Sequence, residues 1–274
     1  MAQSPFHDVG ALVTGASSGI GVAIAKELAR AGARLALTAR RSDRLEAVAA
    51  ECRTLGSPVV VVIVDDLADP AAAARVAAHA MAALGAVDLL VNNAGFAVPG
   101  VTESADPERI AKMIQVNCAS PVALTRCLLP PMLERGRGWI LNVASMAGIV
   151  PAPFQAGYAG TKAFNLNWSE SLREEVASRG VVVSALCPGV TDTEFFEVAG
   201  YRHLGKFMKH RMAAEPVARA GLASLCRKKP RVVPGAFNKV LIFVGVRLAP
   251  RRLLQYVARK LMGSRPPPVR APRP

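Results

Sequence analysis

Short apolar runs recur along the chain, and a stretch with helical periodicity follows nearly every one of them. The runs lie at residues 9–14, 34–38, 58–64, 87–91, 139–143 and 181–186. Strands that alternate with helices in this way pair in parallel through right-handed crossovers, which place helices on both faces of the sheet. The sequence therefore predicts an α/β fold with a doubly wound parallel sheet. A chain of 274 residues is long enough to bury one such domain, which we expect over residues 8–235.

Glycine-rich and polar segments follow the apolar runs. A doubly wound sheet binds ligands in the crevice beyond the carboxyl ends of its strands. The segments in that position are residues 15–21, Asp66, residues 92–95, Ser145 and residues 188–189. We expect them to gather at one edge of the sheet and to form the functional site.

The turn after the first run carries glycines at positions 15, 19 and 21, and a helical stretch follows it. Glycines let the backbone turn tightly and approach a phosphate, and the free amides at the start of a helix favour negative charge. A glycine-rich turn is a weak signal by itself. Its position directly after the first strand favours a phosphate-binding role.

The end of the second run is informative about the cofactor. A dinucleotide fold that selects NAD usually places an acidic residue there, where it bonds the ribose 2′-hydroxyl. This chain has Thr38-Ala39-Arg40-Arg41 instead. Two guanidinium groups suit a 2′-phosphate through bidentate contacts, so Arg40 and Arg41 favour NADP(H) over NAD(H). The alternative is that both arginines are solvated loop residues.

Tyr158 and Lys162 lie four residues apart, a spacing that stacks two side chains on one face of a helix. A positive charge roughly 4 Å from a phenol is worth about 4 kcal/mol at an effective dielectric of about 20, or about three pKa units. The pair therefore predicts a tyrosine that titrates near neutral pH, with desolvation acting in the opposite direction. Ser145 offers a second hydroxyl. The alternative is an amphipathic helix with a packed tyrosine and a solvated lysine.

Together these motifs resemble the short-chain dehydrogenase/reductase family over roughly residues 8–235. The resemblance is carried by TGASSGIG at 14–21, NNAG at 92–95, Asn117, Ser145, Tyr158-x-x-x-Lys162, and Pro188-Gly189 followed by Thr193. It implies a sheet of the Rossmann type, an oxidoreductase activity, and four catalytic residues. Tyr158 would be the general acid/base, Ser145 would hold the substrate oxygen, and Lys162 would lower the pKa of the tyrosine and bond the nicotinamide ribose. Asn117 would position a water that links Lys162 to solvent.

The resemblance also implies which residues contact the cofactor, besides Arg40, Arg41, Tyr158 and Lys162. They are Gly15, Ser17, Ser18, Gly19, Ile20 and Gly21 at the pyrophosphate, Asp66 and Leu67 at the adenine, Asn92, Ala94 and Gly95 along the adenosine, and Pro188, Gly189, Val190 and Thr193 along the nicotinamide. Asp66 is chosen over Asp65 because Leu67 follows it. The asparagine pair at 92 and 93 has an alternative role in bracing its strand. We expect no metal site.

Residues 191–212 hold a large share of the aromatic side chains, among them Phe195, Phe196, Tyr201 and Phe207. In the family this region resembles a mobile lid over the substrate. An apolar lid predicts a lipophilic carbonyl or alcohol substrate, and ordinary helix packing is the alternative.

The formal charge of +14 is unevenly distributed. Residues 1–200 carry 16 basic and 19 acidic side chains, a net −3, whereas residues 201–274 carry 18 basic and 1 acidic, a net +17. Residues 240–246 are uncharged, a run far shorter than the roughly 20 residues needed to span a bilayer. Residues 236–262 therefore predict a basic amphipathic segment, suited to peripheral contact with anionic lipid or to an oligomer interface. The Pro/Arg-rich residues 263–274 predict a disordered tail.

Three functions remain open at this stage. The first is an NADPH-dependent carbonyl reductase or the reverse alcohol dehydrogenase, and the second is an NADP(H)-binding sensor without turnover, attached to a membrane through the basic tail. In the third the tail is itself the functional part, although no nucleic-acid motif accompanies its charge. The resemblance implies a homo-oligomer. Five widely spaced cysteines and the lack of a signal peptide indicate a reducing, cytoplasmic compartment.

Overall fold

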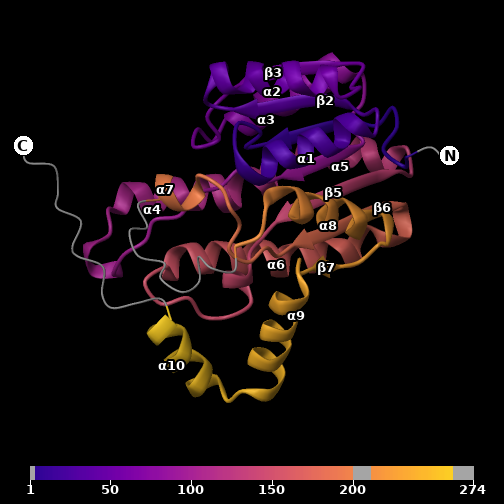
Figure 1. Cartoon of the computed structure of the whole chain (residues 1–274). Helices are drawn as coiled ribbons and strands as arrows, with labels where there is room; N and C mark the ends of the chain where they lie inside the picture. The colour runs from indigo at the N-terminus through magenta and orange to yellow at the C-terminus, as the bar shows by residue number, and fades with distance from the viewer. Residues whose placement is uncertain (1–3, 200–210, 262–274) are drawn as a thin grey trace, which may run out of the picture.

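The computed structural model describes residues 4–199 and 211–261, and within these ranges one sheet of seven parallel strands forms the centre of the molecule (Figure 1). The strands are β1 (Gly10–Thr14), β2 (Arg34–Ala39), β3 (Val60–Val64), β4 (Leu89–Asn92), β5 (Gly138–Val143), β6 (Val181–Leu186) and β7 (Arg231–Val232). Their order across the sheet is β3-β2-β1-β4-β5-β6-β7. The order reverses between β1 and β4, which confirms the predicted doubly wound sheet and creates a ligand crevice there.

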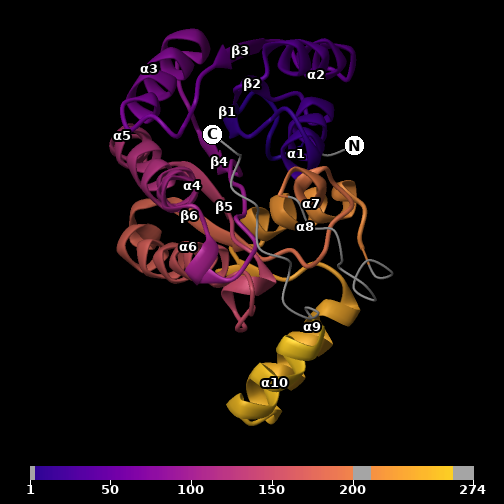
Figure 2. The same cartoon turned by 90° about the vertical axis from the view of Figure 1, so that its left-hand side faces the viewer.

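Helices cover both faces of the sheet. One face carries α1 (Gly19–Arg30), α2 (Ser42–Thr54) and α8 (Ala214–Cys226), whose buried side chains join one apolar cluster. The other face carries α3 (Ala72–Leu84), α5 (Ser120–Glu134) and α6 (Ala156–Val176), which join a second cluster. Figure 2 shows the two sets on opposite sides of the strands.

The strands separate these two clusters because successive side chains point to opposite faces. In β1, Leu12 belongs to the cluster under α3 and α5, whereas Val13 belongs to the cluster under α1 and α8. Both side chains are fully buried. The near-continuous apolar runs in the sequence are the consequence of a parallel sheet covered on both faces.

Shorter elements complete the chain. They are the 3₁₀ turns η1 (Thr102–Ser104), η3 (Met146–Gly148) and η4 (Ala177–Arg179), the helix α4 (Pro107–Ile114), the π-helical turns η2 (Gln115–Ala119) and η6 (Val244–Leu248), and the helices α7 (Phe195–Val198), α9 (Ala236–Phe243) and α10 (Arg251–Leu261). Strand β3 begins two residues later than predicted, because Pro58 has no amide hydrogen to pair.

The C-terminal segment predicted at 236–262 forms α9, η6 and α10, which extend away from the sheet and its covering helices (Figures 1 and 2). Across residues 4–199 and 211–261, every helix is too short or too polar to cross a bilayer. Residues 200–210 of the predicted lid, which include Tyr201 and Phe207, lie outside the described residues, as does the tail at 263–274.

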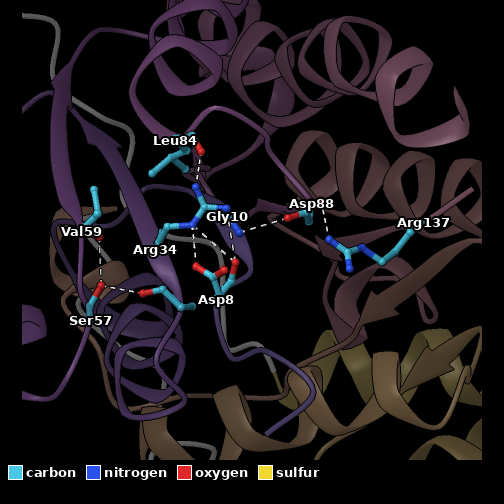
Figure 3. Close-up of polar contacts among 9 residues, drawn as sticks. Asp8, Gly10, Arg34, Ser57, Val59, Leu84, Asp88 and Arg137 are labelled. Atoms are coloured by element: carbon cyan, nitrogen blue, oxygen red, sulfur yellow. Dashed lines mark hydrogen bonds and ion pairs between the residues drawn. The ribbon is translucent and has the colours of Figure 1, made fainter. Parts of the chain in front are cut away.

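Polar contacts at the amino-terminal edge of the sheet fix the relative position of the central strands (Figure 3). Asp88, which is buried, accepts a hydrogen bond from the backbone N–H of Gly10 at 3.2 Å. The guanidinium groups of Arg135 and Arg137 each lie 3.5 Å from the same carboxylate. Arg34 contacts both the Asp8 carboxylate and the carbonyl of Leu84. These bonds lie at the edge opposite the crevice, so they support the fold without entering the site.

We predict that Asp88→Ala lowers the free energy of unfolding by about 1–3 kcal/mol, because the substitution leaves the buried N–H of Gly10 without its acceptor. The shift in the midpoint of urea unfolding measures this loss. The matched control Glu46→Ala changes an exposed acid on α2 and should move stability by no more than about 0.5 kcal/mol. Equal midpoints for the two variants would show that Asp88 does not anchor β1.

Candidate active site

A cavity of about 1120 Å³ opens at the carboxyl ends of the strands. Its wall is built from the glycine turn after β1, the segments that follow β2 to β6, part of α4, the residues before and within α7, and the inner side of α9 and α10. The segments predicted to gather at one edge of the sheet do so. They enclose a volume large enough for a dinucleotide and a small molecule together.

The glycine turn lies directly against the segment that follows β4. Gly15 has φ +64° and Gly19 has φ +57°, and side chains at these positions would lie 2.8 Å from Asn93 Nδ2 and from Thr193 Cγ2 respectively. A side chain at Gly21 would lie 2.3 Å from the carbonyl oxygen of Gly15. The first two glycines line the cavity together with Ser17, Ser18 and Ile20. Gly21 lies behind the wall, where it lets α1 begin close to the turn.

Asn93 holds the turn in place. Its side-chain amide donates to the carbonyl oxygens of Thr14 at 2.9 Å and Gly15 at 3.2 Å. The hydroxyl of Thr14 accepts from the backbone N–H groups of Asn93 and Ala94. Asn93 lines the cavity, in the place that was predicted for its neighbour Asn92. The signal was present in the NNAG motif, but sequence does not show which asparagine faces the crevice.

Asn92 instead lies inside the sheet. It ends β4, is buried, and donates from its amide to Asn142 Oδ1 at 2.8 Å. This position matches the strand-bracing alternative, and its side chain faces away from the cavity wall. Ala94 and Gly95 do line the cavity.

Tyr158 and Lys162 lie on the same face of α6, and both side chains are buried against the cavity wall. Lys162 Nζ donates to the carbonyl oxygen of Val143 at the end of β5, at 2.7 Å, and lies 5.8 Å from the centre of the Tyr158 ring. Ser145 follows β5 and hydrogen-bonds the Tyr158 side chain. Its hydroxyl also accepts from the backbone N–H of Ala147 at 3.1 Å, which orients it at the start of η3. The three side chains therefore meet at one point of the wall.

The protonation of this pair differs from the expectation. Burial raises the pKa of Tyr158 to about 12, and the hydrogen bond with Ser145 only partly offsets it. Burial also lowers the pKa of Lys162 to about 8. The prediction of a tyrosine that titrates near neutral pH is wrong for this chain alone, because the loss of hydration on burial disfavours the charged phenolate. At neutral pH the pair is a neutral phenol beside a charged lysine.

Asn117 lies in the π-helical turn η2, between α4 and α5. Its amide donates to the carbonyl oxygen of Phe96 and to the hydroxyl of Thr161, each at 3.0 Å, and its Oδ1 accepts from the backbone N–H of Phe96 at 3.1 Å. Single π turns inside helices are frequent at functional sites. Asn117 is fully buried and borders Gly95, where a side chain would lie 2.9 Å from Asn117 Oδ1 and 3.4 Å from Lys162 Nζ. Asn117 therefore lies beside the pair without reaching the cavity itself.

The arginines at the end of β2 have partners in the structure. Arg41 Nη1 lies 3.2 Å from a carboxylate oxygen of Glu194, and Arg44 Nη1 donates to the same carboxylate at 2.6 Å. Hydrogen bonds from Arg44 and Arg41 lower the pKa of Glu194. Arg40 is more exposed and lies 3.9 Å from Asp66. Arg44 and Glu194 were not identified from sequence, because their partners are 150 and 153 residues away along the chain.

The remaining predicted residues lie on the wall. Asp65, Asp66 and Leu67 all line the cavity, and the carboxylate of Asp65 is paired with Arg75 at 2.8 Å. Along the opposite side lie Pro188, Gly189, Val190 and Thr193. The carbonyl oxygen of Pro188 accepts from the backbone N–H of Met146 at 2.9 Å, which ties this segment to the turn that carries Ser145.

A doubly wound parallel sheet with a glycine turn after its first strand, and a buried tyrosine and lysine on the wall of the same cavity, indicate a dinucleotide-binding oxidoreductase. Comparison with known proteins supports the same class. The family model described as short chain dehydrogenase matches residues 10–201. The chain belongs to the short-chain dehydrogenase/reductase family.

Individual relatives give the extent of the similarity. A short chain dehydrogenase of Pseudocercospora fijiensis is 40% identical over 186 residues, which cover 67% of this chain and 60% of the relative. Dehydrogenase/reductase SDR family member 7B of Rattus norvegicus is 32% identical over 267 residues, which cover 93% of this chain and 82% of the relative. The solved structure of a short-chain dehydrogenase from Sphingobium yanoikuyae in complex with NADPH has a TM-score of 0.77 and 30% identity, and the match covers 95% of this chain and 98% of that one.

We predict that Tyr158 keeps its proton through the pH range in which an ordinary tyrosine loses it. The folded phenol has a pKa of about 12 against 10.0 for an exposed one, so the unfolded chain loses this proton first and stability falls as pH rises from 10 to 12. The difference in tyrosinate absorbance between the unmodified protein and Tyr158→Phe, without cofactor, measures the titration. A midpoint at or below pH 10 would contradict the dominance of burial.

Proposed function

We propose that the protein is an NADPH-dependent oxidoreductase that interconverts a carbonyl group and an alcohol on a lipophilic small molecule. One observation carries the proposal: Tyr158 and Lys162 are buried beside Ser145 on the wall of a cavity that also contains the glycine turn. If Tyr158 were only a packing residue and Lys162 a solvated one, the ammonium group of Lys162 would lie in water and would not be buried on this wall.

The residues present fit a nicotinamide dinucleotide. The turn at Gly15 and Gly19 leaves a cradle that side chains would fill, at the start of α1, where free amides favour a pyrophosphate. Asp66 and Leu67 would hold the adenine, and Pro188, Gly189, Val190 and Thr193 would lie along the nicotinamide. When bound, the cofactor supplies the hydride.

The side chains of this chain supply the proton and the orientation. The neutral phenol of Tyr158 is the form that donates a proton to the oxygen of a carbonyl substrate, and the hydroxyl of Ser145 would hold that oxygen. The ammonium of Lys162 would stabilise the phenolate that remains. Asn117 would keep a path for protons from solvent, consistent with its place beside Lys162.

The substrate side of the cavity is mostly apolar. Phe195 packs against the ring of Tyr158 with ring centres 5.5 Å apart, and Phe196 and Leu241 line the same cavity. Such a wall favours a lipophilic substrate, because a carbonyl group contributes little binding energy and the burial of apolar surface supplies most of it.

We predict that Tyr158→Phe lowers the rate of NADPH oxidation with a panel of ketones and aldehydes by a factor of about 10² to 10⁴, the usual contribution of a positioned acid. Loss of nicotinamide absorbance measures the rate. The matched control Tyr256→Phe removes an exposed hydroxyl on α10 and should leave the rate unchanged. Undiminished turnover by Tyr158→Phe would remove this residue from its role. Tight NADPH binding without turnover on any carbonyl would favour a cofactor sensor instead.

The preference for NADP(H) rests on Arg40 and Arg41. Arg41 also contacts Ser17 in the glycine turn, at 3.3 Å, so its guanidinium lies where a 2′-phosphate on the adenosine ribose would be expected. The carboxylate of Glu194 forms an ion pair with the same guanidinium group. A 2′-phosphate would therefore compete with Glu194 for Arg41, and the preference reflects the balance between the two anions.

We predict that Arg41→Ala weakens NADPH binding about tenfold and leaves NADH binding nearly unchanged, because one charge-assisted contact is lost. Glu194→Gln should strengthen NADPH binding, since it removes the competing anion. Dissociation constants from cofactor fluorescence measure both effects. Arg126→Ala, an exposed arginine on α5, is the matched control. Equal losses for NADPH and NADH in Arg41→Ala would contradict recognition of a 2′-phosphate.

The family resemblance also favours an assembly of identical chains. The five cysteines are free thiols, which is consistent with the proposed reducing, cytoplasmic compartment.

A further inference from the structure

The C-terminal hairpin, defined as α9, η6 and α10 over residues 236–261, exposes apolar side chains to solvent. Val240, Phe243 and Leu248 are 62%, 61% and 68% exposed, and all three lie outside the cavity wall. The views in Figures 1 and 2 both show the hairpin extending beyond the body of the molecule. Large apolar residues exposed on a projecting segment are typical of an interaction surface.

The hairpin is also strongly basic. Residues 236–261 contain no Asp or Glu, and their basic residues are Lys239, Arg247, Arg251, Arg252, Arg259 and Lys260. On α10 the arginines 251, 252 and 259 share one face, while Leu253, Leu254 and Val257 share the other. A partner of this surface must therefore accommodate both the exposed apolar side chains and the six positive charges.

An anionic lipid surface has both properties, because acyl chains receive the apolar side chains and headgroup phosphates receive the basic ones. A second copy of this chain does not fit as well. Two hairpins that met through these faces would bring twelve positive charges together with no acidic side chain of residues 236–261 between them. The positive charge of the hairpin therefore favours an anionic lipid surface over a second copy of the chain.

The inner side of the hairpin is continuous with the candidate active site. Phe237, Leu241, Leu253, Leu254 and Val257 all line the cavity. The base of the hairpin is fixed by Asn238, whose buried amide donates to the carbonyl oxygen of Pro234 at 2.9 Å. A side chain at Gly189 would lie 2.8 Å from the same amide, so the hairpin meets the segment along the proposed nicotinamide site. The cavity thus runs from the glycine turn to the projecting tip.

We propose that the C-terminal hairpin seats the protein on an anionic membrane surface and that the substrate is a carbonyl or alcohol compound dissolved in that membrane, which enters the cavity between α9 and α10. The entry route rests on the proposed function, whereas the lipid contact does not. The outer residues Val240, Phe243 and Leu248 reach the acyl chains, and the basic residues meet the headgroups. The apolar inner side keeps a lipophilic substrate out of water as it moves to Tyr158.

Co-sedimentation of the full chain with vesicles tests the lipid contact. The protein should bind vesicles of phosphatidylcholine with phosphatidylserine and bind vesicles of phosphatidylcholine alone much more weakly. Arg251→Glu combined with Arg252→Glu should weaken binding about tenfold or more, and Phe243→Asp should weaken it as well. The matched controls are Arg126→Glu with Arg179→Glu, and Val64→Asp, which change exposed residues far along the chain from the hairpin. These controls should bind as the unmodified protein does.

Turnover of a water-soluble ketone with NADPH, measured on the same variants, separates the two proposals. The hairpin variants should retain this turnover and lose only the vesicle-stimulated turnover of a long-chain ketone. Binding that is equal for neutral and anionic vesicles, or unchanged in the hairpin variants, would overturn the lipid contact. Conversion of a dimer to a monomer by Phe243→Asp, without vesicle binding by either form, would assign the surface to a second copy. Absence of turnover with every ketone, while vesicle binding persists, would overturn the proposed function and the entry route but not the lipid contact.

Discussion

The structure depends most on the placement of a charged lysine inside the protein. Lys162 is buried on α6, and its ammonium is held by the carbonyl oxygen of Val143 at the end of β5. A buried ammonium is costly unless its donors find acceptors, which the lowered pKa of this group reflects. That contact joins the helix to the end of the strand, as the hydrogen bond from Asn142 of β5 to Ser169 does further along α6. Tyr158 lies next to Ser145, the second residue after the same strand.

The rest of the cavity is arranged around this point by contacts between strand ends. Asn93 ties the glycine turn to the segment after β4, and Met146 ties the turn at Ser145 to Pro188. Asn238 donates to the carbonyl oxygen of Pro234 and lies against Gly189, which places the base of the C-terminal hairpin beside the segment after β6. The proposed cofactor site, acid and substrate entry thus share one frame, made of strand ends and the segments that follow them.

The sheet and most of the residues on the cavity wall could be predicted from the sequence, because both depend on local patterns. Apolar runs separated by helical stretches define the strands, and the spacing of Tyr158 and Lys162 puts them on one helical face. The remaining features depend on contacts between residues far apart in the sequence, which no local pattern reveals. The pairing of Arg41 with Glu194 joins residues 153 positions apart, and the raised pKa of Tyr158 results from burial by several segments. The choice of Asn93 over Asn92 follows from the pleat at the last residue of β4, where a shift of one position reverses the side chain.

The central claim is that a hydride from a bound nicotinamide and a proton from this frame reach the same carbonyl group. NADPH labelled with deuterium at both C4 positions tests it most directly, with mass spectrometry of the product from a ketone. We predict one deuterium on the carbinol carbon of the alcohol, and formation of this product about 10² to 10⁴ times more slowly by Tyr158→Phe than by the unmodified protein. An alcohol product without deuterium on that carbon would contradict the account.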